Sequence, residues 1–158
     1  MSKDRIQEII KKYQMLPHPE GGFYKETYRG SLAISKRSSA TSIYFLLDGK
    51  NVSHFHSIKS DELWYFHEGD ALRVHLIDPN GQYSFIDVGP ELEKGQTHQA
   101  LVPAHFIFAS ERLEGKAGFS LVGCMVSPGF DFDDFRLYTE EEMLRFLPNQ
   151  EELVARLT

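Results

Sequence analysis

Two histidines and a glutamate lie close together in the first half of the chain. In the stretch SHFHSIKSDELWYFHEG, His54 and His56 flank Phe55, and Glu62 is the sixth residue after His56. Successive side chains of a strand alternate between its two faces, so the two histidines project to the same side. Two imidazoles and a carboxylate can bind a divalent metal, or they can transfer protons without one. A third interpretation is a polar edge strand that is rich in histidine.

The residues after the histidines have the pattern of a second strand. Glu62 and Trp64 share one face of this strand, and the intervening IKSD can form a turn. A hairpin with this turn places Glu62 against the histidine pair. Aromatic neighbours on the same face, together with the returning glutamate, favour a pocket over a solvated strand edge.

The rest of the chain must supply the elements that hold these side chains. Apolar residues recur at helical spacing between residues 6 and 13, which predicts a short N-terminal helix. From residue 22 to residue 138, β-branched and aromatic runs alternate with turn sequences such as DPNG, which predicts about seven to nine short strands. Capping-box patterns beginning at Thr139 and Asn149 predict short C-terminal helices. This order predicts an all-β sandwich or barrel in a single domain, residues 1–158.

The composition is that of an ordinary soluble globular protein, with 41% hydrophobic and 25% charged residues. The formal net charge of −6 and the lack of a basic cluster argue against a nucleic-acid partner. No apolar stretch is long enough to span a bilayer, and the first residues lack the apolar segment of a signal peptide. We therefore expect a cytoplasmic protein without a membrane partner. The single cysteine, Cys124, lies in an apolar run and is expected to be a buried apolar residue.

Several motifs resemble those of a known family. The first motif of cupins contains a glycine, an HxH pair, a glutamate and a second glycine, which here correspond to Gly49, His54, His56, Glu62 and Gly69. The resemblance is closer to a subfamily of uncharacterised cupins, the DUF985 or Cupin_5 group, whose motifs resemble LPHPEGGFYKETYRG, TSIYFLLDG, LVPAHFIFA and LVGCMVSPGFDFDDF. It implies a double-stranded β-helix, the cupin jelly-roll barrel, with short N- and C-terminal helices. It also implies a homodimer.

The second cupin motif departs from the pattern that completes a metal site. The family pattern PxGxxH ends in a histidine ligand, whereas the stretch here is PAHFIF, with Phe108 in the ligand position. His54, His56 and Glu62 are the candidate ligands that remain, and three protein ligands can in principle hold a divalent metal. A phenylalanine aimed into the pocket removes one ligand and the space for bound water. We therefore expect no cofactor and keep a divalent metal as an alternative.

Without a metal, the same residues can perform acid–base chemistry. A histidine oriented by Glu62 can act as a general base near neutral pH. Metal-free cupins that epimerise sugars use a histidine base with a tyrosine or aspartate acid, and the resemblance gives these roles to His56 and to Tyr44 or Tyr24. The remaining pocket residues that we predict are His54, Trp64, Tyr24, Glu20, His75 and Gln99.

The favoured hypothesis is a cupin that binds a small polar or sugar-like ligand in the barrel. Its chemistry would be that of a metal-independent epimerase, isomerase or lyase centred on His56 and Glu62. One alternative is a metal-dependent cupin enzyme that uses His54, His56 and Glu62. Another is a non-catalytic binding or structural barrel, because the cupin fold alone does not identify a reaction.

Four other residues have both a functional and a plain interpretation. Arg29 can contact a ligand carboxylate or phosphate, although such an arginine is more often a surface residue. His18, between two prolines, is interpreted as structural, and Asp131 as a solvated residue at a strand edge. His75 alternates with apolar residues on both sides, so the pattern does not decide which face of its strand enters the barrel.

Overall fold

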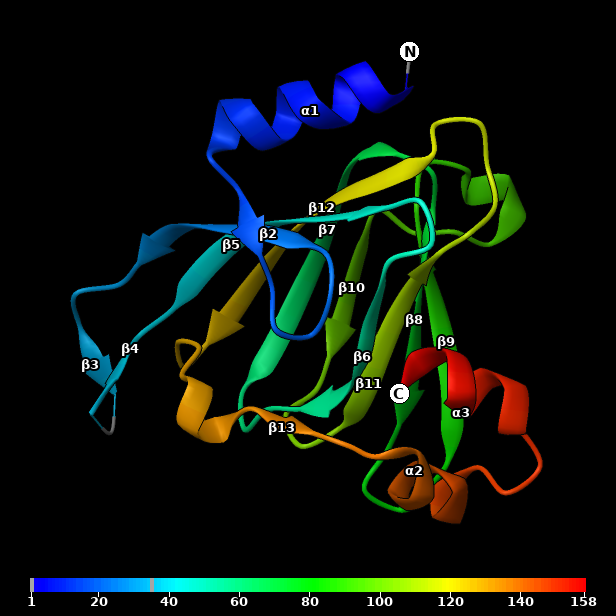
Figure 1. Cartoon of the computed structure of the whole chain (residues 1–158). Helices are drawn as coiled ribbons and strands as arrows, with labels where there is room; N and C mark the ends of the chain where they lie inside the picture. The colour runs from blue at the N-terminus through cyan, green and yellow to red at the C-terminus, as the bar shows by residue number, and fades with distance from the viewer. Residues whose placement is uncertain (1, 35) are drawn as a thin grey trace.

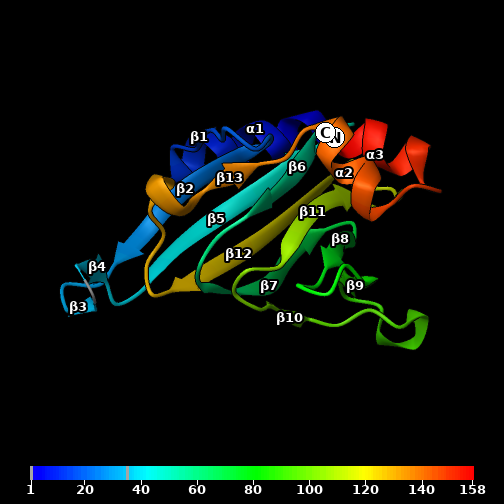
Figure 2. The same ribbon diagram turned by 90° about the horizontal axis from the view of Figure 1, so that it is seen from below.

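Two antiparallel sheets face each other and form a barrel (Figures 1 and 2). The computed structural model describes residues 2–34 and 36–158. In spatial order, the six-stranded sheet contains β1 (Leu16–Pro17), β2 (Phe23–Arg29), β5 (Thr41–Asp48), β12 (Phe119–Ser127), β7 (Asp61–Gly69) and β10 (Gln99–Val102). The five-stranded sheet contains β13 (Arg136–Leu137), β6 (Val52–Ser57), β11 (Ile107–Arg112), β8 (Leu72–Ile77) and β9 (Tyr83–Val88).

Short elements complete the chain. Strands β3 (Ala33–Ile34) and β4 (Arg37–Ser38) pair with each other, and two single turns of 3₁₀ helix cover Leu92–Lys94 and Phe132–Asp134. The α-helices are α1 (Ser2–Tyr13), α2 (Glu140–Phe146) and α3 (Glu151–Leu157). Nine of the described strands have four residues or more. The prediction of an all-β jelly-roll barrel with short N- and C-terminal helices is confirmed.

Side chains alternate along the strands, and the inward-facing side chains of both sheets fill the barrel. Phe45 of β5, Trp64 of β7, Phe108 of β11 and Val122 of β12 are each about 1% exposed and belong to one core cluster. Burying side chains of this size stabilises the fold by roughly 2–3 kcal/mol each. This core holds the two sheets at a fixed separation, so that polar side chains at one end of the same inner faces also have fixed positions.

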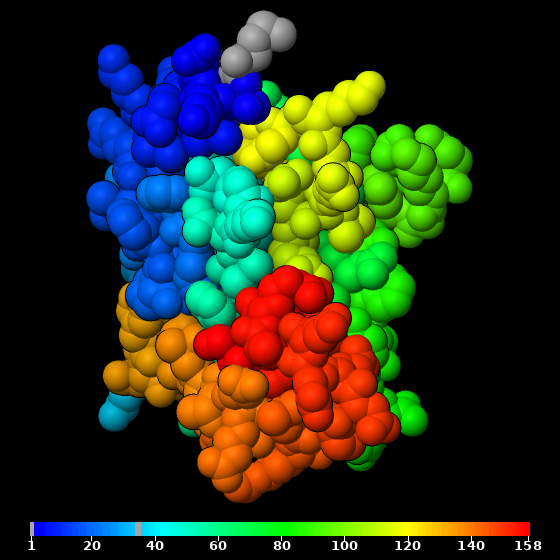
Figure 3. Space-filling view, turned by 45° about the vertical axis from the view of Figure 1, so that its right-hand side comes forward, coloured from blue at the N-terminus to red at the C-terminus, as the bar shows by residue number. Residues whose placement is uncertain are grey.

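The orientation of β6 follows from the packing on its outer face. Phe55 is fully buried against Met143 of α2 and Val154 of α3. Because side chains alternate, this packing turns His56 toward the barrel interior. A slip of one residue would exchange the two faces and expose Phe55, so the outer packing specifies the register. The C-terminal helices, orange to red in the space-filling view, cover the outer face of β6 (Figure 3).

Helix α1 covers the outer face of the six-stranded sheet (Figure 1). Its buried residues Ile6 and Ile9 pack against Leu46 of β5 and Leu121 of β12. Helix α2 begins with the predicted capping box, in which Thr139 and Glu142 bond to each other's backbone N–H groups. Helix α3 begins one residue later than the sequence pattern indicates, since its N-cap is Gln150 and not Asn149. Gln150 makes no side-chain capping bond, so the predicted capping box is not formed. Within the described residues, every helix is too short or too polar to cross a membrane.

Candidate functional site

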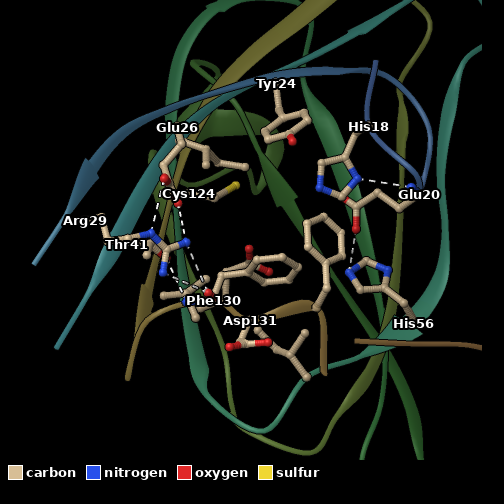
Figure 4. A pocket seen from close by; sticks show the side chains of 15 residues that line it. His18, Glu20, Tyr24, Glu26, Arg29, Thr41, His56, Cys124, Phe130 and Asp131 are labelled. Atoms are coloured by element: carbon tan, nitrogen blue, oxygen red, sulfur yellow. Dashed lines mark hydrogen bonds and ion pairs between the residues drawn. The ribbon is translucent and has the colours of Figure 1, made fainter. Parts of the chain in front are cut away.

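A cavity of about 360 Å³ lies between the sheets at one end of the barrel (Figure 4). Its wall is formed by β2, β5, β6, β7 and β12, by the loop between β1 and β2, and by the segment after β12. This volume lies at the lower end of the range for small-molecule sites. Figure 4 shows polar groups on both sides, with His18, Glu20 and His56 grouped opposite Glu26 and Arg29.

An ion pair between His56 and Glu20 lies in the cavity wall. The Nε2 atom of His56 is 2.8 Å from Oε2 of Glu20, and both side chains are more than nine-tenths buried. The other ring nitrogen, Nδ1, donates to the backbone carbonyl of His54 at 2.6 Å. Burial lowers the pKa of His56, but the Glu20 charge and hydrogen bond outweigh burial, so the pKa is raised. Burial alone raises the pKa of Glu20, and His56 reverses the shift, so the pKa is lowered.

The loop between β1 and β2 brings Glu20 to this position. Its backbone oxygen accepts two hydrogen bonds from His54, one from the backbone N–H and one from ring Nδ1, both at 2.8 Å. Gly21 follows with φ at +113°, and a Cβ atom there would overlap the backbone oxygen of Val52. Only glycine can therefore hold the loop this close to β6. The histidine pair thus fixes Glu20 through both its backbone and its carboxylate.

Glu62 projects into the same cavity from β7 and is 9% exposed. Its backbone registers with Val126 of β12 and Val102 of β10, both of which are buried in the core. Among the described residues, the Trp64 indole N–H acts on its carboxyl group as a hydrogen-bond donor and slightly lowers its pKa. Burial, followed by the nearby charge of Glu20, raises the pKa of Glu62 to about 8. At neutral pH this carboxyl group is therefore mostly protonated, whereas the Glu20 carboxyl is ionised.

His18 and Tyr24 form the wall beside the ion pair. Nδ1 of His18 accepts the backbone N–H of Glu20 at 3.1 Å, which leaves the ring proton on Nε2. Burial lowers the pKa of His18. The Glu20 charge raises this pKa by less and the His56 charge lowers it further, so the ring is uncharged at neutral pH. The ring of Tyr24 packs edge-on against His18 with centroids 4.6 Å apart.

The opposite side of the cavity is half-exposed and carries the second ion pair. Nη2 of Arg29 lies 2.6 Å from Oε1 of Glu26, and its Nη1 and Nη2 atoms lie 3.3 Å from the backbone oxygen of Phe130. The backbone N–H of Phe130 in turn donates to Oγ1 of Thr41 at 2.9 Å. These contacts attach the segment after β12, including Asp131, to the rim of the cavity (Figure 4).

Five of the predicted pocket residues do not line the cavity, and His54, which bonds to the Glu20 backbone beside it, is one of them. Tyr44 faces the outer side of β5, where its ring stacks on Tyr13 of α1 at 4.2 Å. His75 faces the outer side of β8, where Nδ1 and Nε2 contact the Tyr83 hydroxyl at 2.7 Å and Oε1 of Glu111 at 3.0 Å. The prediction that Tyr44 and His75 line the barrel is wrong, because helices cover the outer faces of both strands.

Gln99 also lies outside the cavity, while Trp64 lies beneath it. Gln99 is exposed on β10, and its neighbour Ala100 takes the inward position. Trp64 points inward as predicted but packs between Phe45 and Phe108 in the core instead of lining the cavity. Its indole N–H is buried and interacts with the Glu62 carboxyl group.

The residues of the predicted metal site do not fit a metal ion. Both ring nitrogens of His56 are engaged, and Nδ1 of His54 is bonded to the Glu20 backbone. Phe108 is the register partner of His56, and its ring covers the imidazole at a centroid distance of 4.1 Å. In the described part of the chain, no group of three or more His, Cys, Asp or Glu side chains is arranged to hold a metal. A histidine that binds a metal needs a free ring nitrogen, and in His56 the Glu20 carboxylate occupies Nε2.

Sequence reasoning missed several residues that the fold brings to the cavity. His18 was interpreted as structural, and Asp131 as solvated, but both line the cavity, as do Glu26 and Cys124. Glu20 was predicted only as a ligand contact and instead pairs with His56. The glycine pair after Glu20 was the available signal, since it permits a tight loop against a neighbouring strand.

Comparison with known proteins places this fold and site in a family. Residues 7–138 match the family described as Cupin superfamily (DUF985). The chain therefore belongs to the cupin superfamily, in this DUF985 group. A curated relative, the uncharacterized protein YML079W of Saccharomyces cerevisiae, is 29% identical over 92% of this chain and 81% of its own length.

Solved structures agree with this assignment. Protein SO0799 from Shewanella oneidensis has a TM-score of 0.90 at 44% identity and covers 96% of each chain. A hypothetical protein from Leishmania major has a TM-score of 0.88 at 36% identity, covering 96% of this chain and 97% of the other. An oxalate decarboxylase of Bacillus subtilis has a TM-score of 0.59 at 15% identity and covers 94% of this chain and 38% of that chain. At this identity, the similarity to the decarboxylase concerns the fold alone.

Proposed function

We propose that this cupin binds a small polar or sugar-like molecule in the barrel cavity and transfers protons to and from it without a metal. The reaction class would be that of an epimerase, isomerase or lyase. The observation that carries the proposal is the placement of the His56–Glu20 ion pair and the buried Glu62 carboxyl in one cavity. Two carboxyl groups with pKa values shifted in opposite directions supply a base and an acid at the same pH.

The two carboxyl groups have complementary roles in this chemistry. Glu20 is ionised, and its Oε1 atom is the oxygen that does not bond to His56. It would remove a proton from a carbon next to a carbonyl group, and the C–H electron pair would become the double bond of an enol. Glu62 would donate its proton to the carbonyl oxygen. Glu62 recovers its proton from an enol hydroxyl as the carbon is reprotonated. Delivery of a proton to the opposite face by the Tyr24 hydroxyl or by water gives an epimer, and Glu20 then returns the abstracted proton to that group through solvent. Delivery by Glu20 to a neighbouring carbon gives an isomer.

The structure changes the role that the sequence assigned to Glu62. Sequence reasoning made this carboxylate the group that orients His56, whereas Glu20 occupies that position in the fold. Tyr24 remains the tyrosine that lines the cavity, since Tyr44 faces α1. His56 is then a positioning residue that holds the Glu20 carboxylate and stabilises its ionised form.

Hydrogen–deuterium exchange on carbon tests the proposal directly. The protein is incubated in D₂O with a panel of aldoses, ketoses and hydroxy-ketones, and C–H signals are followed by NMR. Exchange next to a carbonyl is expected with the wild type and is expected to fall by about a hundredfold or more in Glu20→Gln and Glu62→Gln. Ligand binding without any exchange would contradict the catalytic proposal and support a non-catalytic binding barrel.

We also propose that the protein acts as a homodimer, which the family resemblance implies. Light scattering coupled to size-exclusion chromatography tests this, with a monomer mass of 18.2 kDa as the reference. A monomer at micromolar concentration would contradict the proposal. The proton-transfer chemistry uses residues of a single chain, so that outcome would leave it unaffected.

A further inference from the structure

The positive charges of the cavity are already paired by protein groups. Arg29 is the single permanently charged basic residue among the described lining residues, and its guanidinium contacts Glu26 and the carbonyl of Phe130. His56 is paired with Glu20 at 2.8 Å. A phosphate or carboxylate group of a ligand would therefore meet no free cation in this cavity, and binding would require that one of these ion pairs be broken.

The cavity groups whose charge is not paired with an opposite charge are acidic or neutral. Glu62 is buried, and the Trp64 indole N–H is the described group that acts on its carboxyl as a hydrogen-bond donor. Asp131 lies at the rim, and its side chain accepts a backbone N–H of its own turn at 2.8 Å. An anionic ligand would thus meet the charge of Asp131, while Glu20 and Glu26 already neutralise the nearby cations, and like-charge contacts oppose binding.

We infer that the ligand of this cavity is a polyhydroxylated molecule of about monosaccharide size that carries no anionic group, and that phosphorylated or carboxylated sugars are excluded. This inference rests on the proposed function, because it names the ligand class of the same cavity. The cavity volume of about 360 Å³ agrees with this size.

The described side chains match the surface of such a molecule. The protonated Glu62 carboxyl can donate to one hydroxyl and accept from another, as can the hydroxyl of Tyr24. The rings of Phe130 and Phe132 lie edge to face at 4.8 Å on the segment after β12, and both line the cavity. Their apolar faces suit the C–H faces of a sugar ring.

The Arg29–Glu26 pair is the element that determines this specificity. Two guanidinium nitrogens face the Glu26 carboxylate, with Nη2 at 2.6 Å and Nε at 3.3 Å. Replacement of Glu26 by glutamine removes the negative charge and frees the guanidinium for a bidentate contact with an external anion. The substitution keeps the size of the side chain, and the position is exposed, so the fold is expected to be retained.

Matched ligand sets test the inference. Each set contains a free sugar and its phosphate ester, and dissociation constants are measured by ligand-observed NMR and calorimetry. The wild type is expected to bind at least one free sugar about tenfold or more tightly than its phosphate. Glu26→Gln is expected to reduce or reverse the preference against the phosphate. Glu141→Gln, which removes the exposed Glu141–Arg145 pair on α2, is the control and should leave all constants unchanged.

Two outcomes would overturn the inference. These are equal or tighter binding of the phosphate by the wild type, and no binding of any member of the sets. Binding of free sugars without carbon exchange would instead contradict the proposed proton transfer and leave the ligand class intact. The two failures are therefore distinguishable.

Discussion

Nε2 of His56 lies 2.8 Å from Oε2 of Glu20, while the neighbouring His54 donates twice to the backbone oxygen of the same glutamate. Both histidines of the HxH pair thus hold one loop residue. In metal-binding proteins such histidines keep a nitrogen free for the ion. Here their nitrogens are used to position a carboxylate, and this difference leads to most of the predictions below.

Removal of either partner of the buried pair is expected to destabilise the protein. Glu20→Ala or His56→Ala leaves an uncompensated polar group in the wall, and each should lower the free energy of unfolding by about 3 kcal/mol or more. The double variant should lose less than the sum of the two single variants, since the residues interact directly. Urea denaturation of all four proteins measures this coupling.

An exposed ion pair provides the control for this cycle. Arg145→Ala removes the Arg145–Glu141 pair, whose side chains are both more than 70% exposed. Its cost should be within about 0.5 kcal/mol. Additive effects of Glu20→Ala and His56→Ala would show that the two side chains do not interact in solution.

Glu62 should make stability depend on pH in a specific direction. Its pKa is about 8 in the folded protein against 4.5 as the ordinary value, so the unfolded chain releases this proton first as the pH rises. Wild-type stability should therefore fall between these two values, by at most about 1.4 kcal/mol per pH unit from this group. Glu62→Gln lacks the titration, and its stability relative to the wild type should increase up to about pH 8 and then stay constant. Parallel stability curves from pH 5 to pH 9 would contradict the assignment.

Gly21 should be far less tolerant of substitution than Gly49. In both residues φ is positive, at +113° and +54°, but a Cβ at Gly49 meets open space, whereas one at Gly21 overlaps the Val52 backbone. Gly49→Ala should cost about 1 kcal/mol. Gly21→Ala should cost more and displace Glu20, so that ligand affinity also falls. Equal effects of the two substitutions on stability and binding would refute this account of the loop.

Restoring the missing metal ligand should not be sufficient to create a metal site. Phe108→His places an imidazole beside His56, but Nε2 of His56 remains bonded to Glu20. Only the combination with Glu20→Ala frees this nitrogen, so stoichiometric zinc is expected in the double variant alone. Elemental analysis of protein purified without an affinity tag measures the bound metal. Stoichiometric zinc in Phe108→His alone would show that Glu20 does not block the site.

His75 should affect stability without affecting the cavity. It connects Tyr83 to Glu111, and Glu111 also accepts hydrogen bonds from Arg156 of α3 at 2.7 and 2.9 Å. His75→Gln should destabilise the protein by about 1–3 kcal/mol, since it disrupts a buried network. Ligand affinity should be unchanged. A clear loss of affinity would return His75 to the ligand site.

The alternation of side chains allowed part of the site to be predicted from sequence. His54, His56 and Glu62 were expected to face the barrel interior. His56 and Glu62 line the cavity, whereas His54 holds the backbone of the Glu20 loop and is not among the lining residues. Phe108 was expected at the fourth ligand position, and it is the register partner of His56. The position of His56 could be predicted because the outer and inner faces of β6 differ clearly in polarity, so that only one register buries Phe55.

Alternation fails where a strand is covered on both faces. Strand β5 is covered by α1, so apolar side chains occur on both of its faces, and Tyr44 could not be assigned to a face for this reason. Strand β8 does alternate, with Leu72, Val74 and Leu76 in the core, but the pattern does not show which face enters the barrel, so His75 could not be assigned either. Glu20 could not be assigned its role because a loop has no periodicity, and its contact with His56 depends on the path that Gly21 permits.

Strand β1 is at the edge of the six-stranded sheet, so the loop that carries Glu20 lies against the barrel from its margin. The core strands do not depend on the sequence of this loop for their own pairing. In evolutionary terms, Glu20 and the paired core strands therefore belong to separate segments of the chain. Substitutions in one short marginal segment would give a descendant of this chain a different cavity wall on the same strand pairing, at the cost in stability that loss of the His56–Glu20 pair brings.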